Sequence, residues 1–508
     1  MGQVTQCSLI NAFNNTFATA CRRLMSFLAI IILVVSGCQS SDRQIQGQSL
    51  SGQLPIRASQ RLEPKELTKK SQQSTEKKAQ LGSVDSESTD DKEQLYLFNS
   101  FNKNPRNGIQ SNNRSRNSKG SGVGAVLDKN KASKIGVLLP LSGNGEEDGR
   151  AFLDAMQLAF FEVANKNLKL YIADTKGSRA GAAESIQKLI TEDVGLILGP
   201  LFSESTEAIA PLARAAQIPV ISFSNNIKVA RTGVFVFGFL PEQQIVRILK
   251  YAFKNNYRKV ATFAPANAFG ELSVSVARDI INGTDQKLVS EILYDPNTPD
   301  LNQLVREFSE YDNRKQRLQR QKTQLKRQSD EIANDALARL SGLDTLGDPS
   351  FDAVLLPSGG SELLTVAPLL AFYDVDPSRI RLLGSSLWDR VNGLSLEPSL
   401  MGAWYAAPEP KLRLLYEVKF KKMFGYSPPR LSSLAYDAML LGVELTSEDR
   451  DWDGSLVSIT DPTGFRGVDG IVRLLNNGSN ERGLAILEVG RGGVKVIDDA
   501  PSMFFNDN

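Results

Sequence analysis

Residues 195–226, GLILGPLFSESTEAIAPLARAAQIPVISFSNN, decide the fold because they predict a strand, a helix and a second strand in direct succession. The apolar run 195–198 has the composition of a strand buried on both faces. A Gly-Pro pair ends that run, and the hydroxyl of Ser203 is expected to cap a helix that begins at the next residue. Apolar residues at helical spacing continue this helix up to Pro219, and residues 220–223 then form another buried strand.

A strand–helix–strand unit of this kind almost always crosses over right-handed into a parallel sheet. Polar side chains gather at the carboxyl ends of its two strands. They are Ser203, Ser205, Ser222, Ser224 and Asn225. Because open α/β sheets bind ligands outside the carboxyl ends of their strands, this edge is predicted to face a ligand.

Several segments between residues 135 and 474 resemble sequences of one known protein family. They are IGVLLPLSG, GPLFSES, IPVISFSNN, GVFVFGFLPEQQ, GSSLWD, YSPPRLSSLAYDA and GFRGVDGIVRL. Together they resemble type I periplasmic-binding proteins, which have the branched-chain amino-acid-binding fold, and among these they are most similar to the penicillin-binding protein activator lipoproteins.

The resemblance implies an α/β fold of two lobes over residues 133–508, each lobe a parallel sheet flanked by helices. GVFVFGFLPEQQ resembles the first crossing between the lobes, and GSSLWD resembles the return crossing. Lobe 1 is therefore expected at about 134–238 and 388–465, and lobe 2 at about 239–387 and 466–508.

Residues 1–38 are typical of a lipoprotein secretion signal. A basic pair precedes an apolar core of about twelve residues, which is too short to span a bilayer stably. The core ends in VSGC, which resembles a bacterial lipobox with Cys38 as the lipidated residue. The alternative is a short N-terminal membrane anchor that is never cleaved. Gln39, after the cysteine, resembles lipoproteins sent to the outer membrane, so we expect a lipid anchor on the periplasmic side of the envelope.

The composition changes abruptly over residues 39–132, where Ser, Gln, Asn, Lys and Asp dominate. Such a segment cannot bury enough apolar surface to offset the entropy of ordering it. We therefore predict a disordered polar linker, spanning roughly 50–60 Å as a flexible coil.

The composition also excludes several chemistries. The chain has no histidine, which removes Ser-His-Asp centres, Cys-His centres and His-ligated zinc. Its three cysteines, Cys7, Cys21 and Cys38, all lie near the N-terminus. With 59 basic and 57 acidic residues, no global field favours nucleic acid. We predict a non-enzymatic protein with no catalytic residues, metal or cofactor.

The glycines at 143, 145 and 149 follow a predicted strand, as in a dinucleotide-binding loop, but their spacing is wrong. Acidic residues at 146–148 would also occupy the place where pyrophosphate needs free N–H groups, which disfavours nucleotide binding.

A polar segment at about 311–345 stands outside the two-lobe pattern and has strong helical propensity. Leu318, Leu325 and Ile332 recur every seven residues, which is half of a coiled-coil seam. The simpler interpretation is a solvated helical insertion in lobe 2. The functional one is an arm that docks a partner or contacts the cell wall.

The cleft between the lobes is the candidate ligand site. We expect it to be lined from lobe 1 by Ser142, Ser203, Ser222, Ser224 and Asn225, and from lobe 2 and the crossing by Phe269, Ser358 and Trp388. Hydroxyls and a helix N-terminus suit a small carboxylate, and an aromatic ring can cover it. In amino-acid-binding relatives, positions that resemble Ser203 and 222–225 contact the ligand. The alternative is that these serines only cap helices and satisfy turns. Glu242 is the best acidic candidate to contact an ammonium group.

Two functions fit these features. The resemblance implies a cell-envelope regulator that binds and activates a class A penicillin-binding protein, a peptidoglycan synthase. The alternative is a receptor that delivers an amino-acid-like ligand to an ABC transporter. A long linker after an outer-membrane-type anchor favours the regulator, because a receptor docking on an inner-membrane permease has little use for it.

Overall fold

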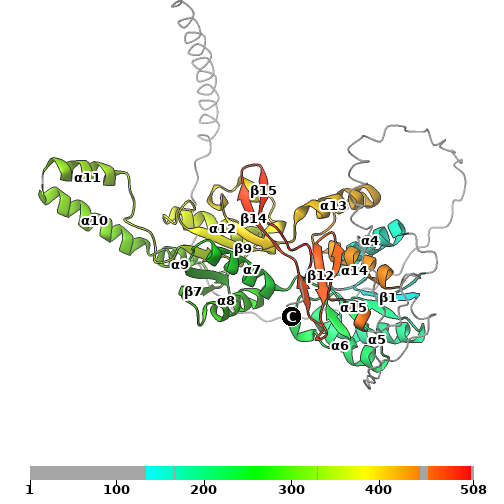
Figure 1. Ribbon diagram of the computed structural model, residues 1–508. Coiled ribbons are helices and arrows are strands. Elements are labelled where there is room, and N and C mark those ends of the chain that lie inside the picture. Colours follow the sequence, from blue (N-terminus) through cyan, green and yellow to red (C-terminus); the bar gives the residue numbers. More distant parts are fainter. Residues whose placement is uncertain (1–132, 164–167, 329, 447–455, 505–508) are drawn as a thin grey trace, which may run out of the picture. The chain divides into compact units, whose positions relative to one another are not determined.

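The computed structural model describes residues 133–163, 168–328, 330–446 and 456–504, all within one unit of the chain, Glu87–Asn508 (Figure 1). The predicted signal, the lipobox at Cys38 and the linker 39–132 lie outside the described residues. Among those that are described, no helix combines the length and the apolar character needed to cross a membrane.

Lobe 1 is built on a five-stranded parallel sheet with the strand order β2-β1-β3-β4-β5. Its strands are β1 (Lys134–Leu139), β2 (Lys169–Asp174), β3 (Leu196–Leu198), β4 (Val220–Ser222) and β5 (Val234–Val236). Its helices are α4 (Glu146–Val163), α5 (Arg179–Thr191), α6 (Ser203–Ala215), α13 (Pro410–Phe424), α14 (Ser432–Leu445) and α15 (Leu456–Ile459).

Alternate side chains of β1 enter different cores, as a strand buried on both faces requires. Ile135 and Val137 pack with α4, α13 and α14 on one face, whereas Leu138 packs with α5 and α6 on the other. The strand–helix–strand unit predicted from residues 195–226 is present as β3, α6 and β4, with Ile197 opposite Val220 in parallel register.

Lobe 2 is built on a seven-stranded sheet with the order β15-β14-β10-β9-β8-β6-β7. Its strands are β6 (Lys259–Pro265), β7 (Lys287–Tyr294), β8 (Ala353–Leu355), β9 (Arg381–Ser385), β10 (Trp404–Ala407), β14 (Ala485–Gly490) and β15 (Gly493–Asp498). The strands from β7 to β10 are parallel, whereas β14 and β15 are antiparallel additions. Its helices are α7 (Pro241–Lys254), α8 (Ala268–Ile281), α9 (Leu301–Phe308) and α12 (Gly360–Phe372). The α/β two-lobed fold is thus confirmed.

A three-stranded antiparallel sheet lies where the chain crosses between the lobes. It consists of β11 (Phe465–Gly467), β12 (Gly470–Leu474) and β13 (Asn480–Arg482). Short 3₁₀ helices complete the description: η1 (Ile227–Val229), η2 (Ser386–Arg390), η3 (Leu394–Leu396) and η4 (Pro398–Leu400).

The lobe boundaries expected at residues 388 and 466 are wrong. Strand β10 pairs in parallel with β9, so the chain stays in lobe 2 until that strand ends at Ala407. Val472 and Leu474 of β12 then pack in the core of lobe 1, and the chain re-enters the sheet of lobe 2 only with β14. The crossings therefore follow β10 and β13.

The polar segment in lobe 2 contains two helices, α10 (Tyr311–Gln328) and α11 (Glu331–Ser341), which lie side by side as a hairpin beyond α9 (Figure 1). Leu318 is buried, but Ile332 is 82% exposed, so the expected seam does not continue to Ile332. The reason is that the chain turns back between the helices. Ala333 is the buried residue of α11 instead.

Candidate functional site

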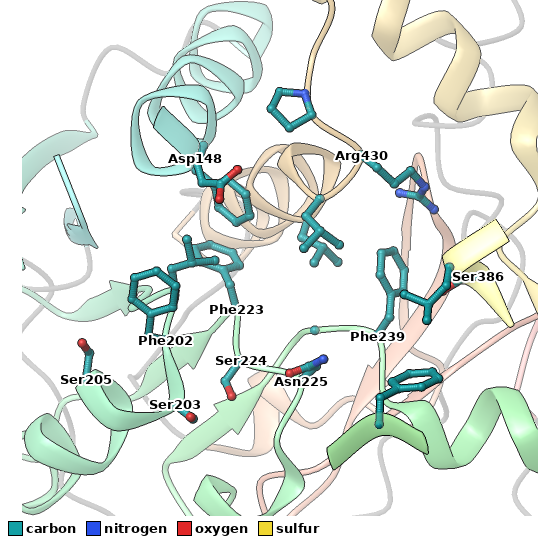
Figure 2. Close-up of a pocket in the computed structure, with 18 of the residues that line it drawn as sticks. Asp148, Phe202, Ser203, Ser205, Phe223, Ser224, Asn225, Phe239, Ser386 and Arg430 are labelled. Carbon is teal, nitrogen blue, oxygen red and sulfur yellow. The ribbon is translucent and has the colours of Figure 1, made fainter. Parts of the chain in front are cut away.

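A cavity of about 800 Å³ opens between the two lobes (Figure 2). This volume is in the range of small-molecule sites, roughly 300–1,000 Å³. It is bordered by the start of α4, the start of α6, the segment after β4, the first crossing, η2, and the segment that leads into α14. Its polar lining residues are Asn144, Asp148, Ser203, Glu204, Ser205, Ser224, Asn225, Gln244, Ser386, Arg390 and Arg430.

Four of the eight predicted cleft residues line this cavity. They are Ser203, Ser224, Asn225 and Phe269. Figure 2 shows Ser203, Ser224 and Asn225 on the lobe 1 side of the open space, with Ser386 and Arg430 facing them. The other four, Ser142, Ser222, Ser358 and Trp388, lie away from it, so their expected place in the lining is wrong.

Ser142 and Ser222 serve the loops of lobe 1 instead. The Ser142 hydroxyl donates to the Asp174 carboxylate at 2.5 Å. Burial would raise the pKa of Asp174, but hydrogen bonds from Ser142, Lys176 and Leu141 outweigh it and lower that pKa. The fully buried Ser222 hydroxyl lies 2.7 Å from Thr206 Oγ1 and accepts from the Ser224 N–H. Both serines therefore hold backbone segments of lobe 1 in place. This agrees with the alternative interpretation, in which the serines cap helices and satisfy turns.

Trp388 fills the core of lobe 2 rather than covering a ligand. Its side chain is fully buried, and its indole N–H donates to the Ser358 carbonyl at 3.0 Å. The ring lies directly on the backbone of Gly384, where an added Cβ would come within 2.2 Å of it. Ser358 is buried beneath this contact, so neither residue reaches the cavity.

Helix α6 presents its N-terminal turn to the cavity. The helix begins at Ser203, and its N-cap is Phe202, which makes no side-chain cap hydrogen bond. The expectation that Ser203 caps the helix is therefore wrong by one position, because Ser203 is already helical. Ser203, Glu204 and Ser205 all line the cavity from this turn. The partial positive charge of the helix end is opposed there by the Glu204 carboxylate.

Aromatic side chains form much of the cavity wall. Five phenylalanines contribute, namely Phe152, Phe202, Phe223, Phe239 and Phe269. Phe152 and Phe223 meet edge to face, with ring centroids 5.2 Å apart. Three of the five come from lobe 1, Phe239 comes from the first crossing and Phe269 from α8 of lobe 2, so a ligand in the cavity would touch apolar surface on both sides.

Arg430 is a site residue that sequence reasoning missed. Its guanidinium bridges Asp389 of lobe 2, at 3.2 Å, and Asp469 of the small sheet, at 3.0 Å. It also lies over the Phe239 ring, 4.9 Å from the centroid. Desolvation alone would lower the pKa of Arg430, but Asp469 and Asp389 outweigh it and raise that pKa. Its partners Asp389 and Asp469 are 41 and 39 residues away in the sequence, so no local sequence pattern could predict these ion pairs.

A second buried charge group lies behind Arg430. Asp437 of α14 accepts hydrogen bonds from the N–H groups of Val468, at 2.8 Å, and Asp469, at 3.2 Å. Burial, and after it the charge of Asp469, raises the pKa of Asp437 to about 7. The guanidinium of Arg482 is also buried here and donates to the carbonyls of Asp469 and Phe237. These charges tie the crossing segments to lobe 1.

Fold and cavity together are those of a binding protein with two lobes, and the chain belongs to the periplasmic binding protein family, whose pattern matches residues 132–493. Among curated proteins it is similar to penicillin-binding protein activator LpoA of Vibrio cholerae, with 27% identity over 152 residues, which is 29% of this chain and 25% of that protein. It is also similar to the uncharacterized protein RP748 of Rickettsia prowazekii, with 26% identity over 182 residues, 35% of this chain and 48% of that protein. These matches thus span less than half of each relative.

Solved structures share the fold at low sequence identity. A putative branched-chain amino acid ABC transporter protein from Rhodospirillum rubrum has a TM-score of 0.56 and 16% identity, covering 72% of this chain and 99% of that one. An ABC transporter substrate-binding protein from Sphaerobacter thermophilus has a TM-score of 0.54 and 17% identity, covering 73% and 98%. The likeness to the penicillin-binding protein activators and the type I fold, both expected from the sequence, are thus confirmed.

Proposed function

We propose that this chain is a non-enzymatic cell-envelope lipoprotein that binds and activates a peptidoglycan synthase of the class A penicillin-binding protein type. The observation that carries the proposal is the similarity to the penicillin-binding protein activators of Vibrio cholerae. Lipidation at Cys38 and a linker over 39–132 belong to the proposal. They would hold the two-lobed module on the periplasmic side of the outer membrane, at an adjustable distance from it.

A protein of this kind acts through binding alone. It raises the rate of a synthase only if it binds the active conformation more tightly than the inactive one. The surface that does this must therefore offer contacts that one conformation of the partner can use and another cannot.

The hairpin of α10 and α11 is a candidate for that surface because α10 is densely basic. Four exposed cations on α10 form no ion pair with a carboxylate in the described part of the chain. They are Lys315, Arg317, Arg320 and Arg327. Unpaired like charges on one helix repel one another, and an acidic partner surface would relieve that repulsion.

The root of the hairpin dictates how this candidate is tested. Arg314 is fully buried and donates to the carbonyls of Ser309, Gly347 and Asp374, and to the Thr345 hydroxyl. Deleting residues 312–342 would therefore remove part of the core of lobe 2. The triple change Arg317→Gln, Arg320→Gln and Arg327→Gln removes charge from exposed positions of α10 and leaves the buried contacts of Arg314 intact.

The decisive experiment combines a pull-down with a lipid II polymerisation assay, using class A synthases of the same organism and the purified full-length chain. We expect binding and a higher glycan-polymerising or crosslinking rate. If the hairpin is the docking surface, the triple arginine variant loses activation. A matched variant that removes three exposed lysines from α13 of lobe 1 keeps it; the changes are Lys411→Gln, Lys421→Gln and Lys422→Gln. Failure to bind any of the synthases would overturn the proposal.

The cavity favours a second candidate, a receptor for an amino-acid-like ligand of an ABC transporter. Its volume and its open position between the lobes suit a small molecule. A ligand that binds only the folded state stabilises the protein and so raises its melting temperature. At a ligand concentration of 100 Kd, the free energy of unfolding increases by about 2.7 kcal/mol. Stabilisation by a common amino acid that is lost in Ser203→Ala or Ser224→Ala would support the receptor.

A further inference from the structure

Arg390, the last residue of η2, lines the cavity from lobe 2 and has no hydrogen-bond or ion-pair partner among the described residues. Its neighbour Asp389 is already engaged, because the Asp389 carboxylate contacts Arg430 at 3.2 Å and accepts from the Tyr405 hydroxyl at 3.2 Å. The two cations that line the cavity therefore differ: Arg430 forms ion pairs with Asp389 and Asp469, whereas Arg390 is attracted by Asp148 and Asp389 but forms no ion pair among the described residues.

The surroundings of Arg390 add to its need for an anion. Desolvation, and after it the charge of Arg430, lowers the pKa of Arg390, while Asp148 and Asp389 act in the opposite direction. The group stays a cation, because arginine keeps its proton in proteins. Arg390 is an exposed residue, so water screens part of the cost, but a carboxylate beside it would replace that water with a charge-assisted hydrogen bond.

Lobe 1 is a poorer place for an anion. Asp148 from α4 and Glu204 from the first turn of α6 both line the cavity from that side. Glu204 opposes the positive end of α6 at the place where a carboxylate would otherwise bind. What lobe 1 offers instead is apolar surface and one buried donor. The Ser224 Oγ accepts from the Asn226 N–H, so its own proton is free to be donated.

We propose that the cleft binds an organic anion with a bulky apolar body, and that Arg390 of lobe 2 holds its carboxylate. The body lies against the phenylalanine walls, and no ammonium group is required. A cavity of about 800 Å³ has room for a ligand with more than one ring. This inference goes beyond synthase activation and reverses the expectation that the carboxylate binds at the serines of lobe 1.

The test uses two probes of nearly the same shape, N-benzoyl-L-phenylalanine and its C-terminal amide, in which a neutral NH2 donor group replaces one oxygen of the charged carboxylate. Calorimetric titration of the purified full-length chain should show that the acid binds 10- to 100-fold more tightly than the amide, as one charged hydrogen bond allows. Arg390→Gln should bring this ratio close to one, and Arg390→Lys should retain part of it. Arg379→Gln, which removes a surface cation of lobe 2 outside the cavity lining, should leave the ratio unchanged.

Several results would overturn the assignment. Equal binding of the acid and the amide would show that no cation of the protein contacts the carboxylate of the ligand. A ratio that survives Arg390→Gln but is lost in Ser203→Ala or Ser224→Ala would place the carboxylate on lobe 1. Absence of binding by either probe would show that the walls do not accept an aromatic body. The assay involves no synthase, so its outcome is separable from that of the activation assay.

Discussion

Replacing Arg430 by methionine removes the cation that two buried carboxylates share. The side chain of Arg430 is 7% exposed, that of Asp389 is 3% exposed and that of Asp469 is 0% exposed. Methionine has a similar length and can still pack on Phe239. Removing one partner of a buried ion pair costs about 3–5 kcal/mol, because the charge left behind has lost water and its nearest cation. Asp389 would keep the more distant cation Arg413, at 3.9 Å, and Asp469 would keep the Ser433 hydroxyl, at 2.6 Å.

Urea unfolding at neutral pH measures this cost. We expect Arg430→Met to lower the unfolding midpoint by an amount equivalent to about 3–5 kcal/mol. Arg258→Met is the matched control. It breaks an ion pair with Asp285 whose side chains are 50% and 72% exposed, so it should cost about 0–1 kcal/mol.

A double variant separates lost charge pairing from lost packing. If the cost comes from uncompensated carboxylates, adding Asp389→Asn to Arg430→Met should recover part of the stability, so the two changes are not additive. A loss for Arg430→Met no larger than that of Arg258→Met would refute the reasoning, as would strict additivity in the double variant.

Three further predictions concern residues described above. Asp437 has a folded-state pKa raised from 3.8 to about 7, so the stability that it contributes is fully present below pH 3.8 and is lost as the pH rises through 7. The free energy of unfolding of Asp437→Asn, measured relative to that of the parent chain by chemical denaturation, should therefore rise by about 2–3 kcal/mol from pH 5 to pH 8. A difference between the two proteins that does not change with pH would contradict this. Gly384→Ala should destabilise lobe 2 by about 1–3 kcal/mol through overpacking against Trp388, measured by thermal unfolding, and a cost near zero would show that the ring can move. Leu318→Ala should cost about 2–5 kcal/mol, whereas Ile332→Ala should change stability by less than about 0.5 kcal/mol; equal effects in urea unfolding would contradict the assigned burial of the hairpin.

The predictable part of the fold rests on local patterns. The unit from β3 to β4 could be predicted because the apolar runs, the helical spacing and the breaking Pro219 all lie within one short stretch. The return crossing could not be placed in the same way. The run WYAA at 404–407 has the composition of a buried strand in either lobe, and only its pairing with β9 assigns it to lobe 2.

Side-chain direction limited the prediction of the site. Ser222 and Ser224 are two residues apart, yet Ser222 turns into a buried hydroxyl pair with Thr206 while Ser224 faces the cavity. The aromatic ring of Trp388 was expected to cover a ligand, but Gly384 leaves room for it to fold back into the core. Such choices depend on distant neighbours, which a linear pattern does not contain.

The buried Arg314 has a mechanical consequence for the hairpin. It fastens the base of α10 to segments 345–347 and 373–374 of lobe 2, so we expect the base of the arm to follow any movement of that lobe. An 18-residue helix is about 27 Å long, and a lever of that length shifts its tip by about 5 Å for a lobe rotation of about 10°. If a molecule bound between the lobes rotates lobe 2, it also displaces the arm. If that displacement changes the affinity of the arm for a bound protein by some factor, the protein changes the affinity for the molecule by the same factor.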